Sequence, residues 1–217
     1  EANTLISDID KHPHVFVLAS ILNREVGTDN VWEIPYKFME RLGSFEFEDI
    51  RKLSLEDVTK LMSNPSSLHM YPNAMAKVLY LGVQHIQERY SGKVSRIWAE
   101  TPSSVTLVNR FNLFSGVNSK SAVKAVSVLV RRFKIPVKDK TAIDISVDTN
   151  VKRVFPRLGL ISKSASDNTI IKKAQELYPP YPGVFDYPLI EIGGKWCKPV
   201  DPDCNACYMM KYCPILI

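Results

Sequence analysis

Apolar side chains recur at helical spacing through the first two-thirds of the chain, which predicts a succession of amphipathic helices. The longest of these segments spans residues 72–90, where Met75, Leu79 and Ile86 fall on one face and Gly92 follows the last turn. Further helices are predicted over residues 14–22, 35–42, 101–110, 121–133, 148–158 and 166–177, with one more beginning at Ser54.

The last third of the chain is less regular in pattern. Residues 136–146 predict an extended or irregular segment, and from Pro179 onward the chain is rich in Pro, Gly and Tyr and then in Cys. The segment 166–177 is therefore the last helix that the pattern predicts. Because strand signals are few, the predicted fold class is all-α.

Composition and charge add bounds to this picture. The chain has 217 residues, of which 45% are apolar and 24% charged, so it can bury a core as one large domain or two small interleaved ones. A net charge of +5 and a pI of about 8.9 favour a polyanionic partner, although many basic proteins bind no nucleic acid. No apolar run approaches the roughly 18 residues of a bilayer span, and the first residues lack a signal-peptide layout. We therefore expect an intracellular protein without a membrane partner.

All four cysteines lie within the last 21 residues, at Cys197, Cys204, Cys207 and Cys213, in the spacing C-x6-C-x2-C-x5-C. Four thiolates can hold structural zinc in tetrahedral geometry, and thiolates also hold iron–sulfur clusters. Two disulfides are a third possibility, which an intracellular chain of this size neither needs nor favours. On ligand chemistry alone, zinc and an iron–sulfur cluster fit equally well.

The cysteine spacing resembles, gap for gap, the C-terminal iron–sulfur loop of endonuclease III and its relatives among the helix-hairpin-helix DNA glycosylases. The resemblance implies that the four cysteines hold a [4Fe–4S] cluster with a structural role. In the family, the loop between the first two cysteines is basic and contacts the DNA backbone. Here Lys198 is the only cation of that loop and Asp201 and Asp203 oppose it, so Lys198 is its one candidate phosphate contact.

A hairpin between two helices resembles a second family motif. The segment 114–122, Phe-Ser-Gly-Val-Asn-Ser-Lys-Ser-Ala, resembles the family pattern L-P-G-V-G-x-K-T-A. Gly116 permits close approach or a positive φ, and Asn118 is the next best residue for the left-handed conformation. Without the cysteines, a simple helix–turn–helix connection explains the same residues. The resemblance implies that backbone N–H groups of the hairpin bind a phosphate, through Gly116, Val117, Asn118, Ser119 and Ser121.

Lys120 occupies the place where lyase members of this family carry their nucleophile. A lysine amine there would attack the sugar C1′, expel the base and form a Schiff base. Such an amine is expected to be partly desolvated, because burial helps it lose its proton near neutral pH. The resemblance therefore implies a catalytic role for Lys120.

The carboxylate partner is expected in an element resembling V-D-T-H, which Val147-Asp148-Thr149-Asn150 matches with Asn in place of His. Asp148 is well suited to cap a helix, and the resemblance adds the stabilisation of an oxocarbenium-like sugar and assistance to Lys120. Asp144 is a rival carboxylate that the motif does not favour. The separation of Lys120 and Asp148 is longer than is typical of endonuclease III, which predicts an additional loop before Asp148.

Further DNA contacts follow from the same resemblance. Residues 18–26 resemble the early helix of the family that ends in a polar wedge, which fills the hole left by a flipped base. Asn23 and Arg24 are the candidates, although ordinary helix-end polarity explains them equally well. Lys152 and Arg153, in the helix after Asp148, are expected to contact phosphates and to make binding salt-dependent.

The resemblance covers the chain from about His14 to Cys213 and implies a two-lobed helix-hairpin-helix glycosylase fold. One lobe, residues 20–133, would be a six-helix barrel with the hairpin, and residues 1–19 with 134–217 would form the cluster lobe. Lys120 and Asp148 would face each other across a cleft.

The implied protein is a monomeric base-excision repair DNA glycosylase with AP lyase activity. Its partner is duplex DNA carrying a damaged, mismatched or abasic nucleotide. The alternatives are a catalytically inactive DNA-binding module of the same fold and a monofunctional mismatch glycosylase. The sequence does not name the base that is removed.

Overall fold

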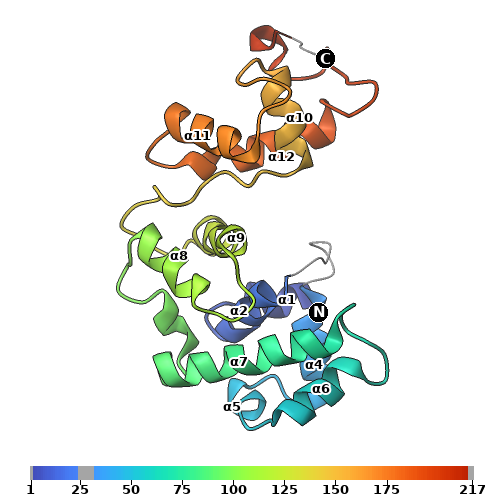
Figure 1. Ribbon diagram of the computed structural model, residues 1–217, viewed down its shortest axis with the longest axis vertical. Helices are drawn as coiled ribbons and strands as arrows, with labels where there is room; N and C mark the ends of the chain where they lie inside the picture. The colour runs from blue at the N-terminus through green and yellow to red at the C-terminus, as the bar shows by residue number, and fades with distance from the viewer. Residues whose placement is uncertain (1, 24–31, 215–217) are drawn as a thin grey trace. The chain divides into compact units, whose positions relative to one another are not determined.

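The computed structural model describes residues 2–23 and 32–214, and all regular elements within these ranges are helices (Figure 1). The all-α prediction is confirmed, since no strand occurs in the described part of the chain. None of the described helices is long and apolar enough to span a membrane. The α-helices are α1 (Ala2–Ser7), α2 (Pro13–Ile21), α4 (Glu33–Leu42), α5 (Phe47–Ile50), α6 (Leu55–Ser63), α7 (Pro72–Tyr90), α8 (Ser104–Asn112), α9 (Ser119–Arg131), α10 (Thr149–Arg157), α11 (Asp167–Leu177) and α12 (Asp186–Lys195), and the short 3-10 helices are η1 (Val94–Ile97), η2 (Pro182–Phe185) and η3 (Met210–Tyr212).

The chain divides into two compact units. Unit 1 consists of the described residues within Glu1–Pro102 and Thr106–Pro136, and unit 2 of those within Ser103–Val105 and Val137–Ile217. The second boundary lies three residues from the predicted one at 133. The first residues differ from the predicted division, because α1 packs against α2 and α4 and so belongs to unit 1.

Helix α2 is the centre of unit 1. Its side chains are buried on almost every face, and it contacts α1, α4, α7, α9 and η1. A helix that is apolar all round is stable only when other elements surround it. Phe16, which is fully buried in α2, lies against Phe111 of α8 and Phe133 after α9. This packing explains why the first residues of the chain join unit 1.

The two helices α6 and α7 form a closely packed pair at the base of unit 1. Helix α6 begins at a capping box, in which Ser54 Oγ accepts from the Asp57 N–H at 3.1 Å and Asp57 Oδ2 accepts from the Ser54 N–H at 3.0 Å. Helix α7 has Pro72 in its first turn and ends at Tyr90, and its C-cap Ser91 is left-handed with φ of 53°. Both boundaries agree with the sequence prediction.

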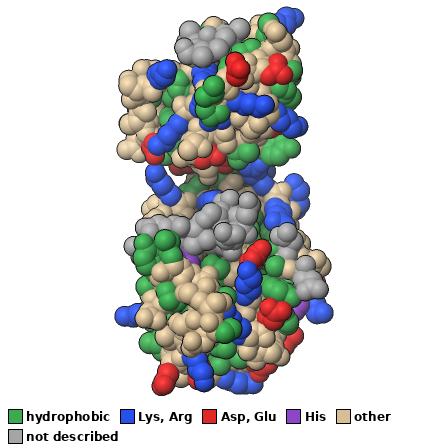
Figure 2. Space-filling model, turned by 90° about the vertical axis from the view of Figure 1, so that its right-hand side faces the viewer, with side chains coloured by type: hydrophobic (Ala, Val, Ile, Leu, Met, Phe, Trp, Pro, Cys, Tyr) green, Lys and Arg blue, Asp and Glu red, His purple; other side chains and the backbone are tan. Residues whose placement is uncertain are grey.

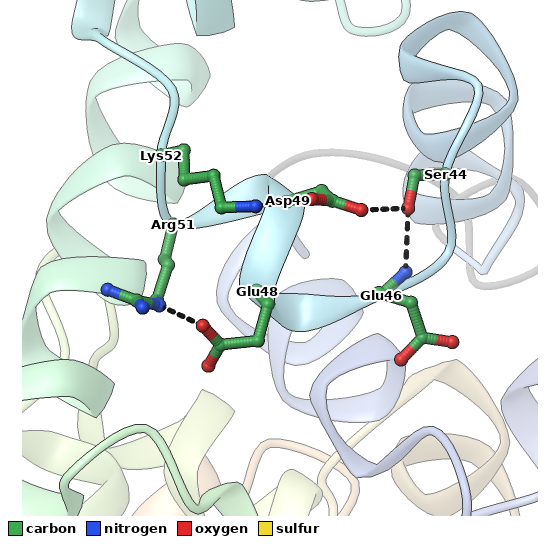
Figure 3. A network of polar contacts seen from close by, with 6 residues as sticks. All are labelled: Ser44, Glu46, Glu48, Asp49, Arg51 and Lys52. Carbon is green, nitrogen blue, oxygen red and sulfur yellow. Dashed lines mark hydrogen bonds and ion pairs between the residues drawn. The ribbon is translucent and has the colours of Figure 1, made fainter.

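Polar contacts hold the short helix α5 in place (Figure 3). Ser44 Oγ donates to Asp49 Oδ2 at 2.7 Å, Lys52 pairs with Asp49 Oδ1 at 2.8 Å, and Arg51 pairs with Glu48. The hydrogen bonds from Lys52 and Ser44 hold the pKa of Asp49 below its usual value. The ion-paired side chains are largely solvent-exposed, so the network orients the helix and contributes little stability.

Unit 2 is built around α10, which packs against α11 and α12 (Figure 1). Val151, Val154 and Phe155 of α10 are fully buried together with Ile170 of α11 and Ile192 of α12. The predicted helices 148–158 and 166–177 agree with α10 and α11. Asp148 therefore directly precedes a helix whose apolar side chains form the core of unit 2.

The sequence prediction missed helix α12, because it placed the last helix at residues 166–177. The segment Asp186–Lys195 contains Pro188, Gly193 and Gly194, and glycines inside a helix normally weaken it. Gly193 is needed because an added Cβ would lie 2.6 Å from Asn150 Oδ1 of α10. Tertiary packing thus forms this helix where local preference opposes it.

The loop predicted before Asp148 is confirmed, since residues 133–148 contain no helix or strand. Hydrogen bonds within unit 2 fix its path. Asp139 Oδ1 accepts from Ser104 Oγ at 2.5 Å, and Ser104 Oγ accepts from the Ala142 N–H at 3.0 Å. Further along, the Ser146 N–H donates to the buried Asp186 at 2.7 Å. From Val137 onward the loop is therefore part of unit 2, whereas residues 133–136 belong to unit 1.

Candidate functional site

The predicted hairpin lies between α8 and α9 in unit 1. Phe114 is buried at its start, 4.5 Å from the His85 ring, and anchors the turn on α7. Gly116 has φ of 80°, and a Cβ there would lie 3.0 Å from Val78 of α7. Both the left-handed backbone and the close approach require glycine at this position, as the sequence indicated.

Asn118 differs from the prediction of a left-handed backbone. It is extended, with φ of −109° and ψ of 169°, and it caps α9 by accepting from the Ser121 N–H at 2.9 Å. An asparagine cap accepts a hydrogen bond from one of the first N–H groups of a helix, which otherwise lack a partner. This stabilisation outweighs the preference of asparagine for a left-handed turn. The Ser121 N–H is therefore already paired. The N–H groups of Gly116 and Ser119 donate no hydrogen bond within the described residues, and Val117 is half-buried between them.

Lys120 is the second residue of α9 and its side chain is exposed. The sequence led us to expect partial desolvation, which the isolated chain does not provide. An exposed lysine at the first turn of a helix can reach a ligand brought to the hairpin. Any desolvation of Lys120 would then come from that ligand.

Asp148 is the N-cap of α10, as the sequence predicted, and it is half-buried. Its Oδ1 accepts from the Val151 N–H at 2.8 Å. No described residue donates a hydrogen bond to Oδ2, so one carboxylate oxygen stays available to a ligand. Capping and a second role are thus compatible in the same side chain.

Asp144, the rival carboxylate, has a different environment. Its Oδ1 accepts from Gln175 Nε2 of α11 at 2.8 Å, within the irregular loop. Asp144 therefore links the loop to α11, whereas Asp148 begins a helix. The choice of Asp148 over Asp144 stays a prediction of the motif.

The four cysteines line one cavity in unit 2, between the end of α10, the end of α12 and the C-terminal turns. Each of them is half-buried, and no disulfide joins any of the four, all of which lie in the described ranges. Within the described residues, no group of three or more Cys, His, Asp or Glu side chains is arranged to hold a metal ion. The remaining lining is mostly apolar and includes Val154, Leu158, Ile192 and Trp196.

Two arginines of α10 have structural roles that sequence reasoning missed. Arg153 Nε donates to the Cys197 carbonyl oxygen at 2.7 Å, and its Nη2 donates to Asn150 Oδ1 at 2.6 Å and to the Gly193 carbonyl at 2.9 Å. Arg157 Nη1 lies 3.5 Å from Cys197 Sγ. The spacing i, i+4 places both on one helix face, and this was the signal available in the sequence.

The remaining candidate DNA contacts lie in different settings. Arg153 is engaged within unit 2, and Lys152 pairs with Asp167 Oδ1 at 2.7 Å, so their phosphate contacts stay predictions. Lys198 is exposed. Asn23 is half-buried just after α2, whereas Arg24 lies outside the described residues. On the face shown in Figure 2, Lys and Arg side chains are interspersed with Asp and Glu.

Comparison with known families shows the superfamily to which the chain belongs. Residues 18–180 match the family model described as HhH-GPD superfamily base excision DNA repair protein. The chain belongs to this superfamily. The match includes the hairpin, Lys120 and Asp148 but ends before the first cysteine. Membership of the HhH-GPD superfamily thus rests on the hairpin region and the surrounding helices, independently of the cysteine spacing.

Individual relatives agree with the HhH-GPD assignment. The chain is 24% identical over 205 residues to endonuclease III of Thermotoga maritima, covering 93% of this chain and 82% of the relative. A solved structure of a trapped endonuclease III–DNA covalent intermediate has a TM-score of 0.59 at 20% identity, covering 98% and 92% of the two chains. A thermostable thymine-DNA glycosylase has a TM-score of 0.60 at 24% identity, covering 94% and 83%. These structural likenesses establish the helix-hairpin-helix glycosylase fold.

Proposed function

We propose that this protein is a DNA glycosylase with AP lyase activity, in which Lys120 is the nucleophile and Asp148 the assisting carboxylate. The observation that carries the proposal is the setting of Lys120. It is an exposed amine in the first turn of α9, directly after a turn that requires Gly116, inside the region that matches the superfamily. The likeness to an endonuclease III that was trapped covalently on DNA supports the lyase activity.

The chemistry follows from an amine and a carboxylate acting on one nucleotide. The Lys120 amine would attack C1′, and the glycosidic bond would break with its electron pair leaving on the base. Loss of a proton from nitrogen and opening of the sugar would give the Schiff base, after which β-elimination expels the 3′ phosphate. The available oxygen of Asp148 would stabilise positive charge on the sugar and accept the proton from Lys120.

Binding of duplex DNA is part of the same proposal. The N–H groups of Gly116 and Ser119 donate to no partner within the described residues. Ser119 is the first residue of α9, where a helix favours a phosphate, and Gly116 lies in the turn before it. Lys198, Lys152 and Asn23 are further candidates for contacts to DNA. Because phosphate contacts release counterions, binding should weaken steeply with added salt.

We further propose that Cys197, Cys204, Cys207 and Cys213 hold a [4Fe–4S] cluster. All four line one cavity, which fits a ligand shared by four thiolates. A single zinc would bring its thiolates within roughly 3.8 Å of one another, since each bonds at about 2.3 Å in tetrahedral geometry. Four thiolates can hold either group, and the gap-for-gap cysteine spacing C-x6-C-x2-C-x5-C supports the cluster over zinc. The cluster would supply a structural brace for the end of unit 2.

Borohydride trapping tests the proposed nucleophile. The protein is incubated with a duplex containing one abasic site, and borohydride reduces any Schiff base to a stable covalent adduct. We expect an adduct with the unaltered protein and none with Lys120→Ala. Lys124→Ala, one turn further along α9, is the matched control and should be trapped normally. Asp148→Asn should slow base release by about 10²- to 10⁴-fold.

The other outcomes distinguish the alternative functions. Tight binding to the abasic duplex without an adduct or base release would identify an inactive DNA-binding module. Base release without an adduct would identify a monofunctional glycosylase, a possibility to which the likeness to thymine-DNA glycosylase lends weight. A panel of duplexes, each with one lesion or mismatch, identifies the base that is removed.

A further inference from the structure

An arginine, Arg157, lines the cysteine cavity although it is not one of the four candidate cluster ligands. Arg157, the last residue of α10, is the only Lys or Arg among the described residues that line this cavity. Apart from the four cysteines and Asp203, its neighbours in the cavity lining are apolar. A cation in such surroundings is costly unless charge or hydrogen bonds compensate it.

The contacts of Arg157 are concentrated on the first cysteine and the two residues that follow it. Nη1 lies 3.5 Å from Cys197 Sγ and donates to the Lys198 carbonyl at 2.7 Å, and Nη2 donates to the Pro199 carbonyl at 3.3 Å. The guanidinium thus holds the loop that leaves Cys197 while it directs an N–H at the sulfur. The Arg157 carbonyl also lies 3.5 Å from Cys213 Sγ, at the other end of the ligand set.

Cys197 is held differently from the next two cysteines. Its N–H donates to the Ile192 carbonyl at 2.7 Å, so its backbone continues from the end of α12. Cys204 and Cys207 are held by short-range turns, with the Cys207 N–H donating to the Cys204 carbonyl at 3.1 Å. A side-chain N–H of α10 directed at the sulfur therefore distinguishes Cys197 from Cys204 and Cys207, whereas the Cys213 sulfur lies against a backbone carbonyl of α10.

We infer that Arg157 is a positioning residue for the cluster, whose N–H group donates to the Cys197 thiolate and raises the reduction potential of the bound cluster. The inference rests on the cluster of the proposed function. Four thiolates bring negative charge into an apolar cavity, and the guanidinium offsets part of it. An N–H donor and a positive charge beside a ligand sulfur stabilise the more reduced, more negative state, which shifts the potential upward.

The experiment compares the unaltered protein with three variants, all purified without oxygen. Arg157→Met removes the charge and the donors, and Arg157→Lys keeps the charge but loses the planar fork that reaches two carbonyls and the sulfur. Lys172→Met is the control, because it removes one exposed positive charge from α11 of the same unit. The measurements are iron per chain, the midpoint reduction potential and the rate of iron release to a chelator.

We expect Arg157→Met to shift the midpoint potential to more negative values and to release iron faster. Loss of a hydrogen-bond partner of a metal ligand typically lowers metal affinity by about 10- to 100-fold. The potential and the iron-release rate of Arg157→Lys should lie between those of the unaltered protein and Arg157→Met. Both values of Lys172→Met should match those of the unaltered protein. Loss of the cluster from a folded Arg157→Met chain also supports the inference. If that variant does not fold, the potential and iron release of Arg157→Lys decide.

An unchanged potential and an unchanged release rate in a cluster-containing Arg157 variant would overturn the inference. Its failure differs from failure of the proposed cluster. An unaltered protein that contains zinc or no metal when purified without oxygen would show that the cluster proposal is wrong, and the inference with it.

Discussion

Several residues at the hairpin and before α10 each stabilise the local backbone and also shape the candidate site. Asp148 caps α10 with one oxygen and keeps the other available, and Asn118 caps α9 beside Lys120. Gly116 satisfies both a left-handed backbone and a close approach to Val78. Substitutions at such positions therefore alter local stability and the geometry of the candidate site together.

Gly116→Ala is the clearest case at this scale. A left-handed backbone costs about 1–2 kcal/mol for a residue with a Cβ, and the Cβ would also press on Val78 at 3.0 Å. Gly43→Ala is the control, because Gly43 has φ of 76° but open space around its Cβ position. Urea unfolding should show a larger loss for Gly116→Ala than for Gly43→Ala. Equal losses would mean that the contact with Val78 contributes nothing.

His14 should make the stability of unit 1 depend on pH. Burial lowers its pKa from 6.5 to about 4, against a hydrogen bond from Nε2 to the Phe45 carbonyl at 3.0 Å. The unfolded chain therefore binds the proton more readily than the folded one. The neutral form is fully stabilising above pH 6.5, and this contribution falls as the pH drops toward 4.

The variant His14→Gln isolates this effect. Between pH 7 and pH 4 the unaltered protein should lose about 3 kcal/mol more of its unfolding free energy than the variant does. Urea unfolding at several pH values measures the difference. Parallel pH curves for the two proteins would contradict the assigned role of His14.

Whole elements depend on contacts between helices that are distant in sequence. Helix α12 contains Gly193 and Gly194 yet forms, since Gly193 lets it approach α10 and the Arg153 guanidinium donates to the Gly193 carbonyl. The approach also brings Cys197, two residues beyond α12, next to the arginines of α10. The α10–α12 pair therefore positions the first cysteine.

The two glycines of α12 should respond oppositely to alanine. Gly193→Ala would place a Cβ 2.6 Å from Asn150 Oδ1 and should destabilise unit 2 by about 1–3 kcal/mol. Gly194→Ala meets nothing within 4 Å and should stabilise the helix by up to about 1 kcal/mol. Thermal unfolding of both variants tests the pair, and a loss of stability in Gly194→Ala would show that helix propensity is not the controlling term.

At the scale of the whole molecule, the two units have separate cores and separate candidate roles. Unit 1 holds the hairpin and Lys120 around the buried helix α2, and unit 2 holds Asp148 and the cysteines around α10. The proposed cluster lies at the C-terminal end of unit 2. Its loss should therefore act on unit 2 first.

Removal of iron by a chelator is expected to raise amide hydrogen exchange in α10, α12 and residues 197–213. Helices α2 and α7 should keep their protection, because their core lies within unit 1. Mass spectrometry of exchanged peptides measures both regions at once. A uniform rise across both units would indicate that they unfold together rather than locally.

The sequence by itself determined the helices with strong apolar patterns, the Gly116 turn, the capping position of Asp148 and the clustering of the cysteines. Each of these depends on residues that are close along the chain, and local spacing records them directly. The irregular segment before Asp148 was predictable for the same reason. The hairpin and Asp148 also lie within the span that matches the superfamily.

Only the tertiary structure decided the membership of residues 1–19 in unit 1, the existence of α12 and the tasks of Arg153 and Arg157. All of these features depend on contacts between separate elements, and the two arginines have partners 40 or more residues away, such as the Gly193 carbonyl for Arg153 and Cys197 Sγ for Arg157. A single sequence records the donor but not the acceptor that folding brings to it. The surroundings of the first cysteine are therefore a property of helix packing, whereas the cysteine spacing is a property of the chain.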